Sequence, residues 1–307
     1  MRMEIGDMAI YNSHGKKTAN AYTYGGNRIV GSVYDANGDT MRIIDSDIYS
    51  DPLIETYFTL SVFPMQAFDV FNGKMFQFKA GGSNNIENEM DVIDISTMTK
   101  ISTSVSVESG HGNSASFSGE YYVSGDAFPL LYVSHGDNPP RVHVNRVATN
   151  SAQCVRTYKF PLEYTGYYSE AAIDSDNTII YMIGSLKNEI YEDDGMNKTI
   201  ISKWDYSNVT QNDDGTYTPE FISLIETDFF AIHQGLTLHN GYVWIISWDY
   251  NKQSNYIIVL NPENGTVIQI IDLNISSECE GIAFISANEA IVGVQGGEYK
   301  KVTFASN

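Results

Sequence analysis

Five polar residues begin five similar segments of the chain, and each is followed directly by glycine or alanine: Gln66, His111, Glu170, Gln234 and Glu280. If the fold brings them together, their side chains could hold a cation, ordered water or a polar group of a ligand. Together with water, they could equally do no more than satisfy the backbone groups of crowded strands. One imidazole and two amides are a poor hard-oxygen cage, so the sequence predicts no metal and no cofactor here.

Two of these residues, Glu170 and Glu280, are carboxylates and raise an enzymatic alternative. Glycoside hydrolases use two carboxylates about 5 to 10 Å apart, on either side of the scissile bond. However, no orienting Arg or His motif accompanies them, and the sequence contains no nucleophile elbow, zinc-protease motif or Walker loop. His135 has no identifiable Ser or Cys partner and is assigned to the candidate ligand-binding residues. Catalysis by Glu170 and Glu280 remains an alternative to binding.

Aromatic residues in predicted loops form a second candidate set. Trp248 and Tyr250 follow an aromatic strand, and other connections contain Tyr121-Tyr122, Tyr167-Tyr168 and Tyr191. Aromatic rings stack on the apolar faces of sugars, while neighbouring Asp and Asn bind hydroxyls. Because the chain has 21 tyrosines, the alternative is that most of these rings pack between sheets.

Short segments rich in Val, Ile, Tyr, Phe and Thr alternate with turn dipeptides along most of the chain. Asn72-Gly73, Asp214-Gly215, Asn240-Gly241 and Asn264-Gly265 are signals for tight hairpins. Amphipathic helical periodicity is almost absent. The sequence therefore predicts an all-β protein.

The five polar positions lie 45, 59, 64 and 46 residues apart, and each interval can hold a four-stranded unit with variable loops. Only 27 residues follow Glu280, enough for three strands. We expect a strand at residues 53–60 to supply the fourth and so remove the open edges of the ring. The predicted fold is a five-bladed β-propeller over residues 51–307, closed by an N-terminal strand.

Residues 1–50 do not follow the repeat and are predicted to form a short N-terminal β extension. It is interpreted as an attachment or stem segment, with an extra strand layer against the propeller as the alternative. Its Asp35-Ala36-Asn37-Gly38-Asp39 resembles half a calcium loop, but no closing Glu follows, so a hairpin turn is expected.

Composition restricts the partners. Asp and Glu number 38 against 18 Lys and Arg, a net charge of −20, and this field repels nucleic acid. No apolar segment approaches the length of a membrane span, so no membrane insertion is expected, and the N-terminus has no secretory signal pattern. Cys154 and Cys279 are predicted to be buried thiols that act as small apolar residues.

The repeat starts Gln66-Ala67-Phe68, His111-Gly112-Asn113, His233-Gln234-Gly235 and Glu278-Cys279-Glu280-Gly281 resemble the blades of five-bladed propellers related to teichoic-acid-biosynthesis protein C. Phage receptor-binding proteins and gut Bacteroidales proteins carry such propellers. The resemblance covers about residues 53 to 304, although blade lengths here are uneven and the motifs identify no sugar. Ile5-Gly6-Asp7-Met8 also looks like segments that precede gut-phage tail and fibre modules.

The resemblance implies a non-catalytic module of a phage tail or fibre, located in the virion and extracellular, that recognises a bacterial surface glycan. Residues 1–50 would then bind other virion or tail proteins, and three or more copies, as in a homotrimer, would raise weak sugar affinity by avidity. Two alternatives remain: a glycoside hydrolase or lyase on a five-bladed propeller, and a structural scaffold of a virion or surface assembly.

Overall fold

A computed structural model describes residues 52–59, 65–79, 87–102, 105–136, 138–188, 197–227, 229–249 and 253–304. In the N-terminal segment it describes only the backbone of four short strands, which pair as two hairpins: β1 (Ala9–Tyr11) with β2 (Lys17–Asn20), and β3 (Tyr22–Tyr24) with β4 (Arg28–Val30). The predicted attachment role of residues 1–50, with the Asp35–Asp39 turn, otherwise lies outside the described residues.

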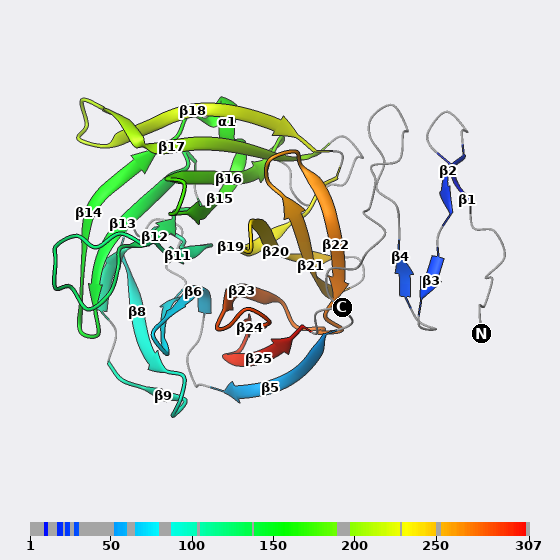
Figure 1. Cartoon of the computed structure of the whole chain (residues 1–307), viewed down its shortest axis with the longest axis horizontal. Coiled ribbons are helices and arrows are strands. Elements are labelled where there is room, and N and C mark those ends of the chain that lie inside the picture. Colours follow the sequence, from blue (N-terminus) through cyan, green and yellow to red (C-terminus); the bar gives the residue numbers. More distant parts are fainter. Residues whose placement is uncertain are drawn as a thin grey trace.

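The remaining strands form four larger sheets (Figure 1). The first contains β6 (Met65–Phe71), β7 (Lys74–Lys79), β8 (Glu87–Asp94), β9 (Thr99–Lys100) and β10 (Val105–Glu108). The third contains β19 (His233–His239), β20 (Tyr242–Asp249), β21 (Ser254–Asn261) and β22 (Thr266–Asp272). The fourth contains β23 (Cys279–Phe284), β24 (Glu289–Val294), β25 (Glu298–Thr303) and β5 (Leu53–Thr59).

The second sheet has eight strands, arranged as two antiparallel groups of four. One group is β11 (Ala115–Phe117), β12 (Leu131–Ser134), β13 (Arg141–Ala148) and β14 (Ser151–Lys159). The other is β15 (Tyr167–Asp174), β16 (Ile179–Ser185), β17 (Thr199–Gln211) and β18 (Tyr217–Glu226). The two groups join through one parallel pairing, between Tyr158 and Tyr217.

The fold is therefore all-β, as the sequence predicts. Its one helix in the described part of the chain, α1 (Leu162–Thr165), spans four residues. No helix among these residues has the length and apolar character needed to cross a membrane.

The first strands of the antiparallel groups surround the centre of the molecule (Figure 1). Their contacts follow a closed order: β6 with β11, β11 with β15, β15 with β19, β19 with β23, and β23 with β6. At the outer edge of the fourth sheet β5 pairs antiparallel with β25, and Phe58 lies opposite Tyr299. The expected pairing of a strand near residue 55 with the last strand is confirmed.

The core lies between neighbouring sheets rather than in one central mass. In β16 all seven residues are buried: Ile180 and Met182 pack against β13 and β14, while Tyr181 and Ile183 pack toward β20 and β21. Because side chains alternate across a strand, a continuous apolar segment is what a sheet covered on both faces requires.

Two of the predicted hairpin turns have the backbone that their dipeptides favour. Asn72-Gly73 connects β6 to β7, and Asn240-Gly241 connects β19 to β20, with positive φ at all four residues. A two-residue turn with both φ values positive matches the twist of antiparallel strands, and Asn-Gly adopts it at low cost. These turns fix the register between each inner strand and its neighbour.

The pairing of β5 gives a stability prediction. Phe58 is 7% exposed and stacks on Tyr299 with 4.4 Å between ring centroids, whereas Leu53 on the same strand is 58% exposed. We expect Phe58→Ala to lower the free energy of unfolding by about 3 kcal/mol and Leu53→Ala by less than about 0.5 kcal/mol, measured by urea denaturation. Equal losses for the two variants would mean that β5 does not anchor the fourth sheet.

Candidate functional site

Gln66, Gln234 and Glu280 are each the second residue of an inner strand, and the pairing register shifts there. Glu170 lies within β15, and His111 lies in the segment before β11. The irregularity falls between Met65 and Phe68 in β6, between His233 and Gly235 in β19, and between Cys279 and Gly281 in β23. Gln66, Gln234 and Glu280 therefore occupy bulges, where an extra residue interrupts the ladder and redirects its side chain. In β15 a similar shift ends at Glu170.

The inner strands approach each other closely enough for their backbones to touch. A Cβ added to Gly235 would lie 2.8 Å from Cα of Gly281 and 2.9 Å from the carbonyl oxygen of Glu280. Between β11 and β15, the hydroxyl of Ser114 donates to the carbonyl of Ala171 at 2.9 Å and accepts from its N–H at 3.0 Å. At Gly235 there is thus no space for a side chain.

Polar side chains from three inner segments meet at Glu170, which is fully buried. Its Oε1 lies 3.2 Å from Nδ1 of His233 and accepts a hydrogen bond of 3.5 Å from Nδ2 of Asn113. Nearby, Nε2 of Gln234 donates to Oε1 of Glu278. We call these four residues, together with Glu170 and Glu280, the central polar cluster.

Three buried atoms of the central polar cluster have no hydrogen-bond partner within the protein: Oε2 of Glu170, Nε2 of His233 and Oδ1 of Asn113. A carboxylate only accepts, so it orients the Asn113 amide and draws the His233 proton to Nδ1. In the neutral tautomer of His233 that carries its proton on Nδ1, all three orphaned atoms are acceptors. Leaving buried acceptors unpaired costs about 1 to 3 kcal/mol each, and a molecule that donates several hydrogen bonds would relieve that cost.

Burial is the main cause that raises the pKa of two glutamates in the central polar cluster, Glu278 and Glu280. Burial, with the charges of Glu278 and Glu170, raises the pKa of Glu280 to about 8. Burial also raises the pKa of Glu278, against the hydrogen bond from Gln234. Glu170 and Glu280 are therefore near enough for one charge to act on the other, although they come from β15 and β23.

The sequence indicates Glu170, Gln234 and Glu280 but not three other members of the cluster: Asn113, His233 and Glu278. His233 stands directly before Gln234, and in a regular strand such neighbours point to opposite faces. The bulge removes that rule, so the sequence alone could not tell which of the two reaches Glu170. Asn113 lies two residues after His111, and Glu278 lies two residues before Glu280. This spacing is the sequence signal from which both could have been predicted.

The structure gives fewer contacts for the other two predicted polar positions, Gln66 and His111. Gln66 is 9% exposed, and its carbonyl oxygen would lie 3.5 Å from a Cβ at Gly281. The backbone N–H of His111 donates to the carbonyl of His135. Contact between a ligand and Gln66 or His111 therefore remains a prediction.

His135 lies beside His143, which is not a member of the central polar cluster. Its Nδ1 lies 3.1 Å from Nε2 of His143. Burial, followed by the charges of His135 and Arg141, lowers the pKa of His143 to about 4, so the His143 ring is neutral near pH 7.

The predicted loop aromatics differ in their exposure. Trp248 lies within β20 and is 9% exposed, so its ring packs in the sheet rather than on a loop surface. Tyr250 and Tyr191 are outside the described residues. Tyr121 and Tyr122 are the exposed pair, at 46% and 51%, and Arg146 lies over the Tyr122 ring. Tyr167 and Tyr168 are half-buried in β15.

A shallow cleft of about 490 Å³ lies between the end of β14 and the hairpin of β17 and β18. Its lining includes Pro139, Phe160, Asn212 and Asp214, and it shares no residue with the central polar cluster. Because the cleft belongs to the outer strands and holds no orphaned buried polar atom in the described residues, the central polar cluster is the stronger candidate site.

No protein-family model matches the chain, and no curated protein matches it. Among solved structures, the tail fibre of a Staphylococcus aureus phage is similar with a TM-score of 0.51 and 12% identity, over 83% of this chain and 53% of the fibre. This chain thus spans about half the length of that fibre. At such identity the likeness concerns the fold.

Two enzymes are less similar in structure. Hydrazine synthase of Kuenenia stuttgartiensis gives a TM-score of 0.41 at 12% identity, over 77% of this chain and 57% of that one. A putative oxidoreductase (glucose dehydrogenase) of Thermus thermophilus gives a TM-score of 0.45 at 10% identity, over 83% of this chain and 100% of that one. We draw no functional conclusion from either.

The raised pKa of Glu280 predicts how stability changes with pH. Between pH 4.5 and about 8 native Glu280 holds a proton that the unfolded chain has lost, so its contribution to stability falls as pH rises through this window. Glu280→Gln removes this titration. Between pH 5 and pH 9 the free energy of unfolding of the parent should fall by on the order of 2 kcal/mol more than that of the variant. Urea denaturation at the two pH values measures this difference.

Glu289→Gln is the matched control, because it removes a carboxylate that is 36% exposed on the same sheet. It should leave the pH dependence of the parent in place. If the free energy of unfolding changes equally for Glu280→Gln and for the parent between pH 5 and pH 9, Glu280 does not titrate as a buried acid.

Proposed function

We propose that this chain is a five-bladed β-propeller that serves as a non-catalytic binding module of a phage tail fibre. Its ligand would be a bacterial surface glycan, bound at the central polar cluster. The observation that carries the proposal is the set of three orphaned acceptors at Glu170, His233 and Asn113. The fold supports it through the likeness to a phage tail fibre.

Counting the blades depends on how the eight-stranded sheet is divided. One parallel pairing, Tyr158 with Tyr217, joins its two halves, whereas each half has continuous antiparallel ladders. We therefore take the pairing as a rim contact between two blades. With the first, third and fourth sheets this division gives five blades, and β5 completes the fifth.

The chemistry of the cluster favours a ligand with several hydroxyl groups. The orphaned atoms are all acceptors, and sugar hydroxyls are compact donors that can also accept from Gln234. His111, Asn113 and Gln234 are half-buried, so a terminal sugar could reach the deeper Glu170 from the side on which they are exposed. The net charge of −20 disfavours an anionic ligand.

Assembly would supply the rest of the affinity. In this proposal residues 1–50 join the propeller to other virion proteins, and the chain is extracellular as part of the particle. A homotrimer would present three propellers, and effective concentration would strengthen weak single-site binding.

One observation favours a second function. With a pKa of about 8, Glu280 keeps its proton at neutral pH as a general acid would, and Glu170 is a carboxylate near enough to act on it. This separation of roles is what glycoside hydrolysis needs. A polysaccharide panel that is cleaved by the parent and not by Glu280→Gln would establish a hydrolase.

Binding can be tested with a glycan array probed by the full chain in its assembled state. We expect binding to at least one bacterial glycan, and Glu170→Gln should weaken it about tenfold or more, because it removes one charge-assisted acceptor. Glu220→Gln is the matched control, since Glu220 is exposed on β18 and should bind as the parent does.

Three outcomes separate the candidate functions. No binding to any glycan by assembled protein would contradict the proposal and favour a structural scaffold. Binding that Glu170→Gln leaves unchanged would place the ligand away from the central polar cluster. Binding with release of shortened product would favour the hydrolase.

A further inference from the structure

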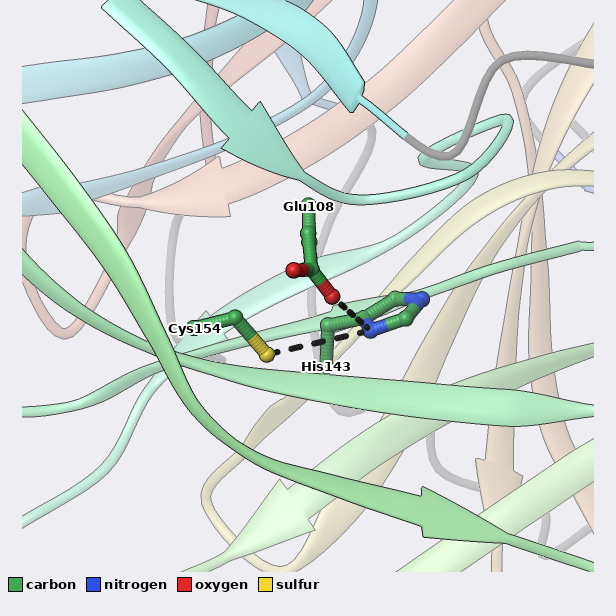
Figure 2. Close-up of side chains that lie close together, drawn as sticks. All are labelled: Glu108, His143 and Cys154. Atoms are coloured by element: carbon green, nitrogen blue, oxygen red, sulfur yellow. Dashed lines mark hydrogen bonds and ion pairs between the residues drawn. The ribbon is translucent and has the colours of Figure 1, made fainter. Parts of the chain in front are cut away.

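A second group of side chains lies outside the central polar cluster, where two sheets meet. Figure 2 shows Glu108, His143 and Cys154 pointing toward one another. They come from β10 of the first sheet and from β13 and β14 of the second. Nδ1 of His143 lies 3.7 Å from Oε2 of Glu108 and 3.9 Å from Sγ of Cys154, and one ligand atom from each residue lies within 4.8 Å of the others.

A β-bulge brings Cys154 to this place. In the hairpin of β13 and β14, His143 pairs with Thr157 and Asn145 pairs with Cys154, so Val155 is the extra residue. Residues 154 and 157 would face opposite sides of a regular strand, but the extra residue puts both on the face of His143. As a result Oγ1 of Thr157 lies 3.2 Å from Nδ1 of His143 and 3.6 Å from Sγ of Cys154.

The His143 ring is oriented as a metal ligand would be. It is 2% exposed, and its Nε2 lies 3.1 Å from Nδ1 of His135. If Nε2 carries the proton and donates it to His135, Nδ1 carries none and faces Thr157, Glu108 and Cys154. Ligating histidines usually donate their other ring N–H to a neighbouring acceptor, which fixes the tautomer and the ring plane.

The three donors are a carboxylate oxygen, an imidazole nitrogen and a sulfur. We propose that Glu108, His143 and Cys154 bind a Zn²⁺ ion, with water in the fourth position. This donor set suits Zn²⁺, whose sites combine sulfur, nitrogen and oxygen, and does not suit Ca²⁺ or Mg²⁺, which take oxygen ligands.

The geometry needs only a small adjustment. Bond lengths of about 2.0 to 2.3 Å place tetrahedral ligand atoms roughly 3.3 to 3.6 Å apart. The present separations, which reach at most 4.8 Å, therefore have to shorten by about 1.5 Å or less. Glu108 can supply the movement, because its side chain is 42% exposed. On binding, the Cys154 thiol gives its proton to solvent and its sulfur bonds to Zn²⁺, which conserves charge and atoms.

Zn²⁺ at this place would connect two sheets. The structure already contains one hydrogen bond across the boundary, from Nδ2 of Asn145 to the carbonyl oxygen of Glu108 at 3.1 Å. A metal bond from β10 to β13 and β14 would reinforce it, and an ion that binds only the native state stabilises the fold by mass action. This inference is independent of the ligand at the central polar cluster.

The test is titration of chelator-treated full-length protein with Zn²⁺ alone, by calorimetry and by metal analysis after gel filtration. We expect one equivalent of bound Zn²⁺. Cys154→Ser should bind it at least about tenfold more weakly. The matched control is Cys279→Ser, which alters the other cysteine, a thiol fully buried in β23, and it should bind as the parent does.

Co²⁺ identifies the ligands through its spectrum. In the parent it should give a sulfur-to-metal charge-transfer band and intense visible bands of a tetrahedral ion, and Cys154→Ser should lose the charge-transfer band. If Cys154→Ser does not fold, Glu108→Gln replaces it, since Glu108 is partly exposed. No saturable uptake of Zn²⁺ by the parent, or uptake that neither variant weakens, would overturn the proposal.

Discussion

The inner strands approach one another closely around the centre of the molecule, and this crowding decides where their side chains can go. Between β19 and β23 the backbones touch at Gly235 and Gly281, and between β11 and β15 a single hydroxyl, that of Ser114, joins the strands through two hydrogen bonds. Strands this crowded have no space for large side chains. Their larger residues therefore point into the interfaces between sheets, which hold the core. At the strand starts bulges interrupt the ladders, and polar groups are buried there without enough partners.

Much of the fold can be read from the sequence because it depends on local chemistry. Asn240-Gly241 specifies a tight turn, the segment at 179–183, rich in Ile and Tyr, predicts a strand, and the shortage of residues after Glu280 indicates that an N-terminal strand completes the last sheet. These inferences need only backbone preference, alternation and chain length. They agree with β19, β20, β16 and β5 as observed.

The site is harder to predict, because a bulge shifts the alternation on which facing direction is judged. Gln234 was identified and His233 was not, yet it is His233 that reaches Glu170. The same difficulty hid the neighbourhood of Cys154. The sequence predicts a buried thiol that acts as a small apolar residue, but Cys154 is half-buried beside His143 because of an extra residue in β14. Both candidate sites thus arise from irregular pairing. They differ in chemistry, since one offers orphaned acceptors and the other a mixed set of oxygen, nitrogen and sulfur donors.

In the proposed function the inner strands create acceptors that a hydroxylated ligand satisfies. A crystal structure of the chain with a bound bacterial oligosaccharide tests it most directly. We expect a sugar hydroxyl within hydrogen-bond distance of Oε2 of Glu170 and of Nε2 of His233. An oligosaccharide bound elsewhere, with Glu170 and His233 turned to protein partners of their own, would contradict it.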